Sequence, residues 1–284
     1  MNKYYCLVAG LPDLSLDDTK LAYSLGELKK LLKEELKESD FRWIELFFGK
    51  FDNINLLRYL KDADDVEMHP LGNLRYEQIA AIVGHHKGND IPKMPAQPEW
   101  FSRFVPAFLE EKPLYPNMSW EDQLTSLYYE TGMKCGNEFI RSWFEFNLDV
   151  NNILAAISCR DFGFSVAESI VGDTELAKTL RTTTAKDFGL AHNFPHLEDV
   201  YRISDEANLM EREKKTDMLK WRWLEENSFF SYFSIENIFT YLIQTGIIER
   251  WLDLNEETGH NRFRGIVSRL KRSFEFQEEY QLKK

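Results

Sequence analysis

A ten-residue pattern occurs three times in this sequence, as FDNINLLRYL at 51–60, LDVNNILAAI at 148–157 and FSIENIFTYL at 233–242. Each copy has an apolar residue, then Asp or Ser, two variable residues, Asn and an apolar run. An aromatic-rich stretch precedes every copy. Internal similarity at near-even spacing is typical of a chain built from repeated helical units.

The pattern also predicts where helices begin. Asp and Ser side chains accept hydrogen bonds from the free N–H groups of a first helical turn, and a preceding apolar residue can pack against that turn. The apolar residues that follow recur at helical spacing. We therefore expect three N-capped core helices, with caps at Asp52, Asp149 and Ser234 and asparagines one turn later at Asn55, Asn152 and Asn237.

Composition describes an ordinary globular protein and disfavours several functions. Hydrophobic residues make up 43% and charged residues 29% of the 284 residues, as in most folded domains. The net charge of −12 argues against general nucleic-acid binding, because the phosphate backbone would repel the protein. The three cysteines include no CxxC pair, so neither a disulfide framework nor a structural zinc site is expected.

Targeting and membrane signals are weak throughout the sequence. The opening MNKYYCLVAGLPDL has too short an apolar part for a signal peptide. No apolar run approaches the roughly eighteen residues that a membrane-spanning helix needs. We expect a cytoplasmic protein, which could still attach to a larger assembly.

Nearly every strong period is that of an α-helix, so the sequence predicts an all-α fold with at most a short β-prone segment at 3–9. Six of the nine prolines lie between residues 92 and 116, and proline prevents long helices. We interpret 88–118 as a crossing between lobes. The predicted lobes are 1–100, 101–195 and 196–284, with helices expected at 17–38, about 73–86, 119–146, 196–226 and 256–277.

The sequence offers no clear catalytic motif. It contains no GxSxG, no GxxxxGK[ST] phosphate loop and no GxGxxG. His85 and His86 with Asp90 are the one cluster that suggests a metal, but adjacent helical residues point about 100° apart. We therefore expect no catalytic, cofactor-binding or metal-binding residue, and keep a metal-dependent hydrolase as a remote alternative.

A basic stretch near the C-terminus contrasts with the acidic chain, because no acid lies between Asn261 and Ser273. It could be a solvated helix face that complements its own helix dipole. It could equally contact an acidic partner surface or anionic lipid headgroups. The candidate contact residues are Arg262, Arg264, Arg269, Lys271 and Arg272.

The repeated pattern resembles the Asp-x-x-Asn-Leu helix starts of the C-type stalk protein of archaeal and bacterial V-type ATPases, whose eukaryotic counterpart is the d-type stalk protein. FSIENIFTYL followed by IIERW resembles the C-terminal stretch of that family. YYCLVAGLPDL resembles a shorter bacterial family that is associated with V-type ATPase genes. The basic residue after the Asn-Leu start is Lys61 in the first copy, but Ser158 and Ile243 replace it in the others, so no partner contact is transferred to individual residues.

This resemblance implies a funnel-like protein of three similar helical lobes that takes part in ion transport without catalysing a reaction. Its expected partners are the central-stalk subunits and the membrane proteolipid ring, between which it would pass torque, and it would bind no nucleic acid. Its membrane association would be indirect, as a cytoplasmic protein peripheral at the inner face of the cell membrane. The alternative is a helical adaptor or regulator of soluble partners with the same repeat ancestry.

Overall fold

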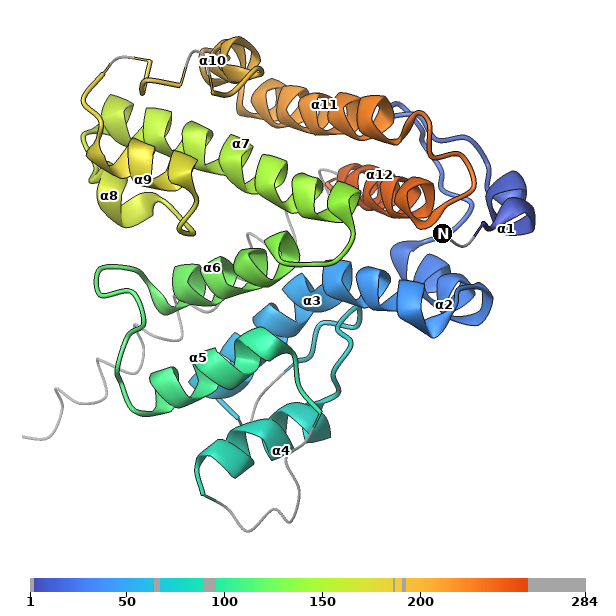
Figure 1. Cartoon of the computed structure of the whole chain (residues 1–284), viewed down its shortest axis with the longest axis horizontal. Helices are drawn as coiled ribbons and strands as arrows, with labels where there is room; N and C mark the ends of the chain where they lie inside the picture. Colours follow the sequence, from blue (N-terminus) through green and yellow to red (C-terminus); the bar gives the residue numbers. More distant parts are fainter. Residues whose placement is uncertain (1–2, 64–66, 89–95, 186, 191–192, 255–284) are drawn as a thin grey trace, which may run out of the picture.

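The all-α prediction is confirmed by the computed structural model, which describes residues 3–63, 67–88, 96–185, 187–190 and 193–254 (Figure 1). Within these ranges the chain forms helices and connecting loops and no strand. None of the helices in the described ranges is both long and apolar enough to cross a membrane. The predicted closing helix at 256–277, with all five basic residues of the candidate contact, lies outside the described residues.

Three pairs of consecutive helices form the body of the molecule, and the other six helices of the described residues connect or cover them (Figure 1). The pairs are α2 (Leu25–Glu35) with α3 (Glu38–Lys61), α6 (Trp120–Met133) with α7 (Glu138–Phe162), and α11 (Leu209–Ser228) with α12 (Ile235–Asp253). The other helices are α1 (Tyr5–Gly10), α4 (Tyr76–His86), α5 (Glu99–Leu109), α8 (Val166–Ser169), α9 (Glu175–Thr182) and α10 (Leu197–Ser204).

Aromatic side chains join the three pairs at the centre of one continuous core. Phe239 of α12 is fully buried and meets Phe47 of α3 edge-on, with ring centroids 6.3 Å apart. It also meets Phe139 of α7 edge-on at 6.5 Å. Edge-to-face geometry suits the charge distribution of aromatic rings and adds to the free energy gained by burying them.

The helix-start prediction is wrong for two of the three patterns. Asp52 and Asp149 lie inside α3 and α7, which begin more than two turns earlier. Asn137 caps α7 instead, by accepting a hydrogen bond from the Ile140 N–H. The reason is that the aromatic lead-ins themselves have helical periodicity, so each helix extends back through them. Ser234 does precede α12, but its hydroxyl donates to the Ser231 carbonyl and does not cap the helix.

Several other predicted elements differ from those in the structure. The β-prone segment is the short helix α1, because the structure offers it no strand partner within the described residues and an unpaired strand leaves its N–H groups unbonded. The helix expected at 17–38 begins at Leu25, after a capping box formed by Ser24 and Glu27. The 119–146 and 196–226 predictions each divide into two helices, and the predicted lobe boundary at residue 100 falls inside α5.

Candidate functional site

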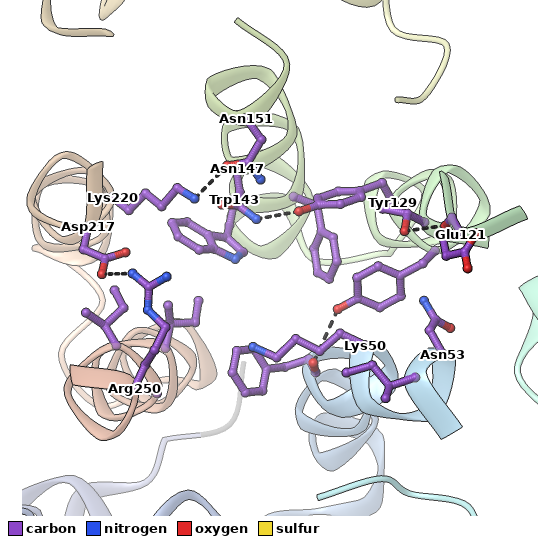
Figure 2. Close-up of a pocket in the computed structure, with 18 of the residues that line it drawn as sticks. Lys50, Asn53, Glu121, Tyr129, Trp143, Asn147, Asn151, Asp217, Lys220 and Arg250 are labelled. Carbon is purple, nitrogen blue, oxygen red and sulfur yellow. Dashed lines mark hydrogen bonds and ion pairs between the residues drawn. The ribbon is translucent and has the colours of Figure 1, made fainter. Parts of the chain in front are cut away.

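A cavity of about 410 Å³ lies at the junction of the three helix pairs, between α3, α6, α7, α11 and α12 (Figure 2). Its walls combine aromatic rings, among them Trp143 and Phe144, with amide and charged side chains. A volume in this range is typical of sites that hold small molecules. It is the strongest candidate site in the described part of the chain.

The second helix of each pair contributes a stripe of residues with the same spacing to this cavity. Residues at positions i, i+3 and i+7 of a helix share one face. The stripes are Phe47, Lys50 and Ile54 on α3, Phe144, Asn147 and Asn151 on α7, and Ile243, Gly246 and Arg250 on α12. The three helices thus have related roles around one central space, although the third sequence pattern does not supply the α12 stripe.

Two lysines enter the cavity without a carboxylate partner among the described residues. Lys50 remains exposed to the solvent of the cavity, and its ammonium lies 4.1 Å from the ring centre of Phe47. Lys220 donates to Asn151 Oδ1 at 2.9 Å, which is a neutral acceptor. The cavity walls restrict hydration, and Lys220 and Arg250 repel Lys50, so the pKa of Lys50 falls to about 8.

The pKa of Lys220 also falls to about 8, chiefly because the surrounding protein removes water from its ammonium. Asp217 and Glu213 partly oppose that fall, whereas Arg250 adds to it. At neutral pH both lysines are still mainly protonated. With Arg250 they give the cavity lining three cations against the carboxylates of Asp217 and Glu121.

Arg250, in contrast, is compensated by acids. Its guanidinium donates to Asp217 Oδ2 and lies 3.5 Å from a carboxylate oxygen of Glu213. Asp217 is buried, and the same oxygen accepts a hydrogen bond from Trp251 Nε1 at 2.7 Å. The Asp217 carboxylate therefore fixes the guanidinium on one side of the cavity.

Amide and hydroxyl groups on α3, α6 and α7 complete the polar lining (Figure 2). Asn147 Nδ2 donates to the Tyr129 hydroxyl at 2.7 Å. Burial raises the pKa of Tyr129 to about 12, so this hydroxyl stays protonated at neutral pH. Asn53 Oδ1 accepts from Trp100 Nε1 at 2.7 Å, which holds that amide in place.

Three of the sequence-predicted residues, Asp52, Asn55 and Asn152, lie outside this cavity and hold later segments of the chain by hydrogen bonds. Both oxygens of Asp52 accept hydrogen bonds from the Asn73–Leu74 segment, which leads into α4. Asn55 and Asn152 each bond to the backbone of a later segment. These side chains bind the chain to itself, so they do not form a ligand site.

Two further predicted positions, Asp149 and Asn237, have different surroundings. Asp149 is buried, yet its Oδ1 has no hydrogen-bond partner, and burial raises its pKa to about 7 with a further contribution from Glu145. Asn237 is half-buried and lines a separate cavity near α1. Asp149 and Asn237 therefore lack the two-bond arrangement of Asn55 and Asn152.

The histidine pair gives no metal site within the described residues. His85 and His86 end α4 with ring centres 5.7 Å apart, and Asp90 lies outside the described residues. No group of three or more metal-ligating side chains occurs in the part of the chain that the structure describes. The sequence analysis did not single out the cations of the cavity, because Lys50 stands alone in an aromatic run. The helical spacing of Phe47, Lys50 and Ile54 is the sequence feature that places Lys50 on the face turned to the cavity.

Comparison with known proteins identifies the family. Residues 1–274 match the model of a family described as "Protein of unknown function (DUF2764)". The chain belongs to this family. No curated protein and no solved structure matches the chain. The family description assigns no activity.

Proposed function

We propose that this protein is a non-catalytic connector in the central stalk of a V-type rotary ATPase, where it links the stalk to the membrane proteolipid ring. The observation that supports it best is that the second helix of each pair, α3, α7 and α12, turns one face to the same central space. A funnel of three similar helical units requires this arrangement. The proposal also draws on the sequence resemblance to the C-type stalk protein of these enzymes.

The packing suits a part that transmits torque. One aromatic core runs through all three helix pairs, and Phe239 contacts both other pairs. Buried side-chain clamps at Asn55 and Asn152 add hydrogen bonds between helices and loops. A densely packed interior has low compressibility, so a force applied to one pair is transmitted to the others.

Affinity purification from the native host tests this proposal. A tagged copy is expected to co-purify from gently solubilised membranes with the proteolipid ring and the catalytic head, in near-equal copy to the other stalk proteins. Deletion of the gene is expected to uncouple ATP hydrolysis from ion transport in the same membranes. An ATPase that purifies intact and coupled without this protein would refute the proposal and favour an adaptor of soluble partners.

A further inference from the structure

Two ammonium groups of the central cavity form no ion pair among the described residues. Lys50 and Lys220 have no carboxylate within ion-pair distance, and Arg250 repels both. Asp217 and Glu213 attract Lys220 from farther away, but both pair with Arg250. Glu121 lies at the edge of the cavity, but Lys61 binds it at 2.6 Å. Keeping two ammonium groups in this enclosure opposes folding, and an anion placed between them would offset that cost.

The cavity has room for a small organic molecule. Its volume of about 410 Å³ lies in the range of about 300–1,000 Å³ that is typical of small-molecule sites. It is far larger than a halide ion needs, so the occupant can have a substantial organic part.

The cations and the aromatic surface of the cavity together indicate the chemistry of its ligand. A phosphate monoester carries a charge of about −1.5 to −2 at neutral pH, which matches two ammonium groups. Lysine binds phosphate as a point charge, and a guanidinium contributes further N–H donors. The half-buried ring of Tyr129 provides aromatic surface in the same cavity (Figure 2).

We propose that the central cavity binds a phosphorylated small molecule, with its phosphate between Lys50, Lys220 and Arg250 and its organic part on the side of the cavity that Tyr129 lines. The site draws cations from α3, α11 and α12, so the ligand would tie three elements of the fold together. This proposal does not depend on a role in a rotary ATPase, because the charge and shape of the cavity carry it.

Calorimetric titration of the full chain with inorganic phosphate, AMP and adenosine tests the proposal. Phosphate and AMP are expected to bind, AMP more tightly, whereas uncharged adenosine is not. Lys50→Gln and Lys220→Gln should each weaken AMP binding by about tenfold or more, since each removes one charge from the phosphate site. The matched control is Lys30→Gln, which changes an exposed lysine of α2 outside the cavity.

Chemical labelling of the wild-type chain provides a measurement that needs no variant. Bound AMP is expected to protect Lys50 and Lys220 from an amine-reactive reagent, and to leave Lys30 unprotected. The proposal is overturned if neither phosphate nor AMP binds at concentrations up to about 10 mM. It is equally overturned if binding occurs but Lys50→Gln and Lys30→Gln affect it alike, because the anion then lies elsewhere.

Discussion

Asn55 and Asn152 make the same pair of hydrogen bonds in two different helix pairs. Asn55 Nδ2 donates to the His69 carbonyl at 3.2 Å, and its Oδ1 accepts from the His69 N–H at 2.6 Å. Asn152 makes the same two bonds to Val171, at 2.8 and 3.0 Å. The repeated asparagine therefore fixes the segment that follows its helix, a role that its sequence position alone did not reveal.

Replacing either asparagine should destabilise the protein. Asn152→Ala leaves the Val171 N–H and carbonyl without their partners in a partly buried place, so we expect a loss of about 1–3 kcal/mol in the free energy of unfolding. Asn55→Ala should cost a similar amount. Urea denaturation measures both, with Asn117→Ala as the control because Asn117 is exposed. Equal stability of all three variants would contradict the clamp.

Asp149 should make stability depend on pH. Its pKa is about 7 in the folded protein against 3.8 for an ordinary aspartate carboxyl, so the folded state holds this proton more tightly. The unfolded chain loses the proton first as pH rises, and stability therefore decreases between about pH 4 and pH 7. Asp149→Asn mimics the protonated carboxyl and should gain a few kcal/mol relative to wild type at pH 8, but little at pH 4.

Thermal unfolding of wild type and Asp149→Asn across this pH range measures the effect. Asp52→Asn is the matched comparison at the equivalent position of α3. In the wild-type protein, Asp52 Oδ2 accepts a hydrogen bond from Asn73 Nδ2 at 2.7 Å. In Asp52→Asn an amide nitrogen would take the place of this oxygen, so two hydrogen-bond donors would face each other. We expect Asp52→Asn to lower the free energy of unfolding by about 1–3 kcal/mol. Parallel pH profiles for wild type and Asp149→Asn would rule out the assigned titration.

Gly132 permits the close approach of α6 and α7. A Cβ at this position would overlap the ring of Phe144, which is buried in the core. We expect Gly132→Ala to destabilise the protein by about 1–3 kcal/mol, despite the better helix propensity of alanine. Gly10→Ala is the control, because an added Cβ there has no atom within 4 Å. Similar melting temperatures for both variants would contradict this packing.

The side-chain amine of Lys50 should be unusually reactive. With a pKa of about 8, Lys50 is neutral in about a quarter of the molecules at pH 7.5, whereas a lysine of ordinary pKa is neutral in about one molecule in a thousand. An amine-reactive reagent should therefore label Lys50 ahead of most other lysines, as mass spectrometry of limited labelling can show. Slow labelling of Lys50 at pH 7.5 would contradict its lowered pKa.

Removing the charge of Lys50 should stabilise the folded protein. Because the folded state binds this proton less tightly than the unfolded chain, stability increases as pH rises from about 8 to 10.5. Lys50→Met should therefore raise the free energy of unfolding at pH 7, by at most about 1 kcal/mol, since solvent in the cavity screens the repulsion. The advantage should vanish near pH 10.5, where the side chain is neutral in both states.

Much of the local structure follows directly from sequence. Ser24 and Ser119 cap α2 and α6 by accepting from N–H groups of the first turn, as their residue types indicate. The helix expected at about 73–86 is α4, from Tyr76 to His86. These features depend on neighbours within a few residues, and such neighbours are visible in a linear chain.

The sequence by itself determined that this chain is helical, and it singled out Asn55 and Asn152 as members of a repeat. Only the tertiary structure decided what the repeat does and where the charges meet. Asn55 bonds to a backbone segment 14 residues away, and Asn152 to one 19 residues away. Lys50, Lys220 and Arg250 share a cavity although they come from α3, α11 and α12. The physical reason is that helical periodicity is a local property, whereas hydrogen-bond partners and desolvated charges depend on which helices pack together.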